Sequence, residues 1–95
     1  MKIEQIHDSI LKTGICRYGD RKYRLFLCTS PFFPGTGDCA DDPKTREDRL
    51  INCYCIWFED LITTGRISAG GGYYEHLPDA IRVAESSGGF EGWIN

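Results

Sequence analysis

An alternating apolar segment beside a Gly-Asp turn constrains the fold most strongly. Residues 22–28 place Tyr23, Leu25 and Leu27 on one face of an extended chain and Arg24, Phe26 and Cys28 on the other. This period of two residues indicates a β-strand, and Gly19-Asp20 between it and the apolar residues 10–17 indicates a turn. The sequence therefore predicts an antiparallel hairpin.

Two further segments have the character of strands. Residues 50–58 are the most hydrophobic stretch, and their β-branched and aromatic side chains favour a central strand with both faces at least partly covered. Residues 66–75 are also expected to be extended, with three glycines inside the strand. Because no Gly-Lys-Ser or Gly-Lys-Thr follows these glycines, we expect a bulge or close packing against an aromatic ring rather than a phosphate-binding loop.

The clearest helix lies between His76 and Gly88. Its apolar residues recur at helical spacing: Leu77, Ala80, Ile81 and Ala84. Pro78 fits the first turn, and His76 occupies the expected cap position, where capping or packing is favoured over catalysis. The tail, residues 90–95, is expected to dock against the sheet. The predicted fold class is α+β, a two-layer domain in which one C-terminal helix packs on one face of a small antiparallel sheet of three to four strands.

The length of 95 residues leaves room for a single domain over residues 1–95 with one hydrophobic core. No apolar run approaches the roughly 20 residues that a bilayer crossing needs, and the first residues do not have the character of a signal peptide. We therefore expect a soluble intracellular domain.

Five cysteines are present: Cys16, Cys28, Cys39, Cys53 and Cys55. Their odd number, without a secretory signal, predicts reduced thiols. A structural zinc site needs two close ligand pairs, whereas here Cys53 and Cys55 form the only close pair. We expect buried thiols that pack as small apolar groups, and neither a metal nor another cofactor.

Residues 29–50 are predicted to form a long irregular loop, and loops of this length are usually functional. Phe32 and Phe33, framed by Pro31 and Pro34, either fold back over the small core or form an exposed anchor for a protein partner. Acidic side chains follow them at Asp38, Asp41, Asp42, Glu47 and Asp48. Their spacing is not that of a calcium loop, so we assign them to partner binding.

The chain carries a net charge of −3, which argues against a general nucleic-acid binder. Residues 12–24 are nevertheless basic. They supply an alternative surface made of Arg17, Tyr18, Arg21, Lys22 and Arg24. In this alternative, a sheet-type DNA-binding protein directs the arginines to phosphates and guanines and the tyrosines to the backbone or to stacking. The acidic remainder of the chain would repel the flanking phosphates.

An enzyme is not expected. Catalysis needs a nucleophile with a base, paired acids or a metal, and neither His7 nor His76 lies in a recognisable catalytic motif.

Residues 71–85 combine a strand that ends in Gly-Tyr with the pattern Leu-x-x-Ala-Ile-x-x-Ala-Glu. This pattern resembles small α+β proteins of bacteriophages and other mobile elements, which include anti-CRISPR inhibitors. The resemblance implies a protein-binding inhibitor in the bacterial host cytoplasm, which occludes the nucleic-acid groove of an effector complex such as a defence ribonucleoprotein. The acidic side chains would then face basic residues of the partner, with Phe32 and Phe33 as anchors.

Overall fold

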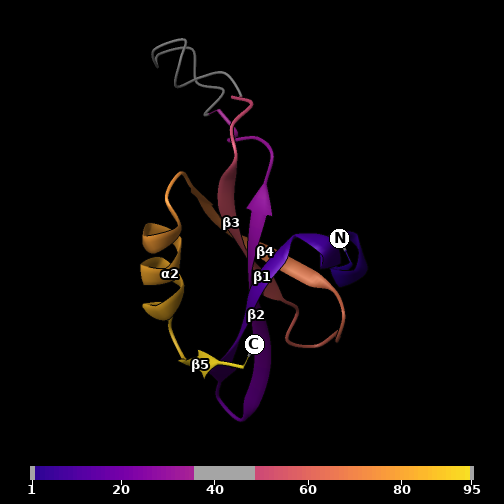
Figure 1. Ribbon diagram of the computed structural model, residues 1–95. Coiled ribbons are helices and arrows are strands. Elements are labelled where there is room, and N and C mark those ends of the chain that lie inside the picture. The colour runs from indigo at the N-terminus through magenta and orange to yellow at the C-terminus, as the bar shows by residue number, and fades with distance from the viewer. Residues whose placement is uncertain (1, 36–48, 95) are drawn as a thin grey trace.

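The predicted hairpin forms the middle of the sheet. The computed structural model describes residues 2–35 and 49–94. Strand β1 (Ile10–Tyr18) pairs with β2 (Arg21–Ser30) through a turn in which Gly19 has a φ of 63°. Three more strands follow: β3 (Cys53–Glu59), β4 (Ile67–Tyr74) and β5 (Phe90–Trp93). In the described part of the chain these strands form one antiparallel sheet with the order β4-β3-β2-β1-β5 (Figure 1).

The sheet has five strands rather than three to four, because the C-terminal tail forms β5. The tail docks as predicted, but as a strand beside β1 in which Trp93 lies opposite Gly14. The absence of a side chain at Gly14 makes this possible, since a Cβ there would lie 2.7 Å from the Phe90 ring. A short apolar tail thus becomes an edge strand.

The segment between β2 and β3 begins and ends about two residues later than predicted. Strand β2 continues to Ser30, which pairs with Cys53, so residues 29 and 30 belong to the sheet. Strand β3 begins at Cys53 and not at residue 50. An isolated bridge joins Phe33 and Arg49. Cys39 lies outside the described residues. The same holds for the five acids that were predicted to bind a partner: Asp38, Asp41, Asp42, Glu47 and Asp48.

The predicted helix is α2 (Leu77–Glu85), which packs on one face of the sheet (Figure 1). Ala80 and Ala84 are fully buried in a core whose sheet residues are Cys16, Leu25, Leu27 and Ile56. His76 occupies the N-cap position, but its side chain makes no capping hydrogen bond. No helix within the described residues combines the length and the apolar character that a bilayer crossing requires.

The N-terminal residues cover the other face of the sheet, which the sequence left to solvent, to the loop or to a partner. Two short 3₁₀ helices, η1 (Ile3–Gln5) and η2 (His7–Ser9), lie on the side opposite α2 (Figure 1). A second core forms beneath them from Ile6, Phe26, Cys28, Cys55 and Ile67. The N–H of Ile3 donates to the Gly65 carbonyl at 3.0 Å and fixes this cover.

The glycines of β4 act as predicted. A register shift lies between Cys55 and Trp57, which is a bulge in the β3–β4 ladder. A Cβ on Gly70 would lie 3.1 Å from the Trp57 ring. Close aromatic packing therefore explains the missing side chain.

Candidate functional site

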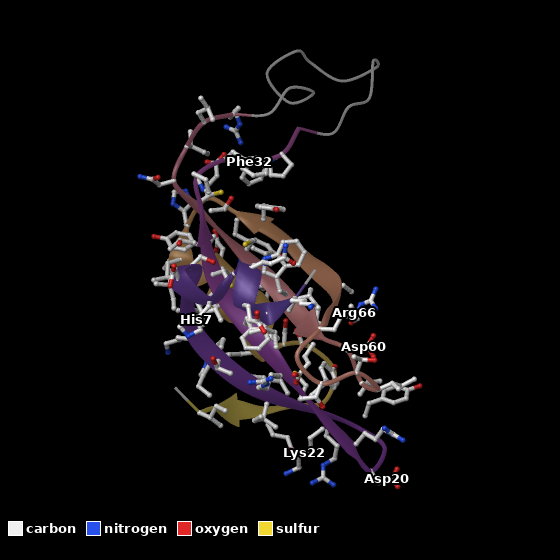
Figure 2. The ribbon with its side chains drawn as sticks, turned by 90° about the vertical axis from the view of Figure 1, so that its right-hand side faces the viewer. His7, Asp20, Lys22, Phe32, Asp60 and Arg66 are labelled. Carbon is white, nitrogen blue, oxygen red and sulfur yellow. The ribbon has the colours of Figure 1, made fainter. Side chains whose placement is uncertain are left out.

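An aromatic cluster of Phe32, Phe33, Trp57 and Tyr73 occupies one end of the sheet. The ring centroid of Tyr73 lies 5.9 Å from that of Phe32, 6.3 Å from that of Phe33 and 6.5 Å from that of Trp57. Figure 2 shows Phe32 at the opposite end of the molecule from Asp20, at the tip of the β1–β2 hairpin. The two phenylalanines therefore fold back onto the sheet.

Hydrogen bonds hold the backbone of Phe32 in place. The Ser30 hydroxyl donates to the Phe32 carbonyl at 2.8 Å, and the Cys53 thiol donates to the same oxygen at 3.0 Å. Ser30 is itself buried. The Phe32 side chain nevertheless keeps 36% of its surface exposed, so a rigid backbone presents a partly open ring.

The start and the end of the irregular segment are held together beside this cluster. Phe33 and Arg49 exchange two backbone hydrogen bonds of 2.8 and 2.9 Å. The Arg49 guanidinium lies over the Phe33 ring, 4.9 Å from its centroid, and forms an ion pair with Glu75. The next residue, Leu50, is 91% exposed. Exposed apolar groups thus flank both ends of residues 36–48.

The predicted basic residues gather around the hairpin, and acids pair with most of them. Figure 2 shows Lys22 and Asp20 at the hairpin end. Arg17 and Lys22 both contact Glu91, at 3.0 and 3.5 Å. Arg24 pairs with Glu59, so two carboxylates are shared among three cations and reduce their positive charge without cancelling it. The remaining two predicted residues are Arg21, whose guanidinium donates to the Leu61 carbonyl at 3.4 Å, and the exposed Tyr18.

Glu59 is a buried acid that the sequence analysis did not single out. Its carboxylate is 6% exposed and accepts four hydrogen bonds. The Arg24 side chain gives two of them, at 3.1 and 2.6 Å, while the N–H groups of Arg24 and Gly65 give the others. The feature of the sequence that could have identified Glu59 is its position directly after residues 50–58, the most hydrophobic segment.

The pKa of Glu59 reflects the hydrogen bonds that its carboxylate accepts. Burial acts to raise the pKa of Glu59, but the hydrogen bonds from Arg24 and from the Gly65 N–H outweigh it. The pKa is therefore lower than the usual value for glutamate. A group whose pKa is lower in the folded than in the unfolded chain stabilises the fold while it is ionised.

We expect acid to destabilise the protein through this group. The contribution of Glu59 is present above the unfolded pKa of about 4.3 and is lost as the pH falls through the lower folded value. Thermal unfolding followed by circular dichroism should show the melting temperature falling as the pH drops from about 5 to about 3. The Glu59→Gln variant should show a shallower decline, and an identical decline in both proteins would contradict this assignment.

The four cysteines of the described chain are free and buried. Cys16, Cys28 and Cys55 lie in the two apolar cores as predicted, whereas the Cys53 thiol donates a hydrogen bond to the Phe32 carbonyl. Within residues 2–35 and 49–94, no three His, Cys, Asp or Glu side chains are grouped as ligands of a metal ion. His7 belongs to η2 in the N-terminal cover, whereas His76 is the N-cap residue of α2 on the other side of the sheet.

No protein-family model, curated protein or solved structure matches the chain.

Proposed function

We propose that this chain is a non-enzymatic protein-binding module whose contact surface surrounds Phe32 and Leu50. The observation that carries this proposal is the pair of exposed apolar groups beside a fixed aromatic cluster. Phe32 is 36% exposed on a backbone held by three hydrogen bonds, and Leu50 is 91% exposed beside the Phe33–Arg49 bridge. Rigid aromatic anchors surrounded by apolar contacts are typical of binding hot spots.

The sequence between these two residues supports a basic partner. Residues 36–48 contain five acids and two basic residues, a net charge of −3. Opposite charge on a partner would speed encounter, while the apolar anchors would slow dissociation. Together with the resemblance to mobile-element inhibitors, this charge supports an anti-CRISPR-like mechanism. The chain would occupy the basic nucleic-acid groove of a bacterial defence ribonucleoprotein and exclude the nucleic acid.

The alternative, a DNA-binding protein that uses the basic hairpin, has weaker support. Glu91 and Glu59 occupy three of its cations, which are Arg17, Lys22 and Arg24. A sheet face that enters a DNA groove must also be open, whereas α2 and the N-terminal residues pack on the two faces here and leave the exposed residues 17–22 of the hairpin beyond them. Both observations favour a protein partner.

The Phe32→Ala variant tests the anchor. The tagged protein is incubated with nuclease-treated bacterial lysate, the bound complex is identified by mass spectrometry, and its affinity for the purified chain is then measured. We expect Phe32→Ala to weaken the affinity about 30-fold or more, the loss of a hot-spot aromatic. The matched control is Ile62→Ala, because Ile62 is 83% exposed next to Asp60, far from Phe32 (Figure 2). It should leave the affinity unchanged.

Charge variants separate the two candidate functions. Changing the acids of residues 36–48 to Asn or Gln should slow association and weaken its dependence on salt, whereas Arg21→Glu should have little effect. Equal affinity of Phe32→Ala and wild type, in folded proteins, would exclude the proposed anchor. Loss of every partner after nuclease treatment, together with DNA binding that Arg21→Glu removes, would favour the alternative.

A further inference from the structure

Two buried thiols face each other across the centre of the sheet. Cys28 on β2 and Cys55 on β3 are direct partners in the antiparallel ladder. Directly opposed residues in such a ladder have Cα atoms about 4.5 or 5.5 Å apart. Both spacings lie within the range of about 4.4–6.8 Å that a disulfide spans. The pairing therefore places these two residues at a Cα spacing that a disulfide can span.

The two side chains share one environment and contact each other. Both belong to the core beneath the N-terminal cover, together with Ile6 and Phe26. The interaction between the thiols lowers the pKa of Cys55 and raises the pKa of Cys28, and the Trp57 side chain also lowers the pKa of Cys55. Because the two residues are directly opposed, oxidation of one thiol leaves the other beside it to resolve the product.

We propose that Cys28 and Cys55 form a reversible intramolecular disulfide when the protein meets a hydroperoxide. This redox site is independent of the proposed protein-binding function.

The reaction balances with hydrogen peroxide as the oxidant. The Cys55 thiolate attacks one peroxide oxygen, the O–O bond breaks, and the departing oxygen takes up a proton and leaves as water. Cys55 is then a sulfenic acid. The sulfur of Cys28 attacks the sulfur of Cys55, an S–S bond forms, the S–O bond breaks, and a second water leaves with the proton of Cys28. Two thiols lose two electrons in total, and one peroxide is reduced to two waters.

The burial of the two thiols limits the size of the oxidant that can reach them. Cys28 is 0% exposed and Cys55 is 4% exposed, so a large disulfide such as oxidised glutathione cannot approach the folded pair. A small neutral peroxide needs only a local opening of the cover that contains Ile6. This cover consists of two helices of three residues each, and short segments at chain ends open at low cost.

The other described thiols are differently placed. Cys16 lies in the core on the opposite face, beneath α2. Cys53 lies opposite Ser30, and its thiol donates to the Phe32 carbonyl at 3.0 Å. Direct opposition to another cysteine thus distinguishes Cys28 and Cys55.

The experiment uses the full chain, reduced and then freed of reductant. Hydrogen peroxide is added in small excess, free thiols are alkylated, and the intact mass and the unreduced peptide map are recorded. We expect two fewer alkyl groups than on the reduced protein, a loss of about 2 Da from the chain itself, one linked peptide pair containing Cys28 and Cys55, and full reversal by a dithiol. The new covalent ring encloses residues 29–54, and closing it should raise the melting temperature by on the order of 10 °C.

Variants and competing outcomes make the test decisive. Cys28→Ala and Cys55→Ala should each abolish the linked peptide, while Cys16→Ala, the matched buried control, should retain it. Should either variant fail to fold, the wild-type peptide map decides on its own. A disulfide that contains Cys53 or Cys39, stable sulfinic acid at Cys55 without a disulfide, or five thiols that stay reduced would each overturn the proposal.

Discussion

Replacing Glu59 with alanine is expected to lower the free energy of unfolding by about 3 kcal/mol. The substitution removes the acceptor of two backbone N–H groups, those of Arg24 and Gly65, and leaves the Arg24 guanidinium without its partner. Each buried donor left unsatisfied costs about 1–3 kcal/mol, and the partly exposed Arg24 recovers some solvation. In a domain with a total stability of about 5–15 kcal/mol, this is a large fraction.

Glu91→Ala is the matched control for this prediction. Glu91 also pairs with hairpin cations, Arg17 and Lys22, but it does so on the surface, where ion pairs contribute about 0–1 kcal/mol. Urea unfolding of the two variants and of wild type, with slopes compared, gives the difference directly. Equal losses of unfolding free energy in the two variants would show that burial does not increase the contribution of Glu59 to stability.

The local elements were predictable because each has its own periodic signal. Alternation over residues 22–28 and the turn at Gly19 place the hairpin, and helical spacing of apolar residues places α2. The glycines of β4 were predicted to allow close packing, and Trp57 lies against Gly70. For the hairpin and α2 the decisive residues are near neighbours in sequence, whereas the aromatic partner of Gly70 lies on another strand.

Contacts between segments that are far apart in the chain could not be predicted from the sequence. The tail has only four strand residues, too few for alternation to be distinguished from a docked coil, so β5 was missed. The N-terminal cover has no strong pattern of its own, and its role depends on Ile6 meeting a core built from distant strands. Local patterns do not report such pairings.

The candidate site shows the same division. Phe32 and Phe33 stood out because prolines frame two aromatic residues, but Tyr73, which both rings contact, gave no such signal. The sequence could not show that the hairpin cations have acidic partners, because Glu91, which contacts both Arg17 and Lys22, is 74 residues away from Arg17. Sequence patterns identified the exposed candidates and could not identify what binds or neutralises them.

Replacing Gly89 with alanine is expected to lower the free energy of unfolding by about 4 kcal/mol and to detach β5 from the sheet. Gly89 has a φ of 78°, a conformation that penalises any side chain by about 1–2 kcal/mol. A Cβ there would also lie 2.0 Å from the Arg17 carbonyl oxygen, which is backbone and cannot rotate away. Relief requires the chain to move off β1, which breaks the 2.8 Å hydrogen bond from the Arg17 N–H to the Gly89 carbonyl.

The neighbouring residue supplies the control. A Cβ on Gly88 meets no atom within 4 Å, so Gly88→Ala should be neutral or stabilise by a few tenths of a kcal/mol, roughly, through the unfolded state. Urea unfolding measures both variants, and amide exchange at Arg17 and Ile94, whose N–H groups bond to Gly89 and Thr13, follows β5 itself. Gly89→Ala should accelerate exchange at both amides beyond its effect on global unfolding. Equal stability of the two variants would mean that the tail accommodates the added methyl group without leaving the sheet, and β5 would then be an adaptable edge rather than a fixed strand.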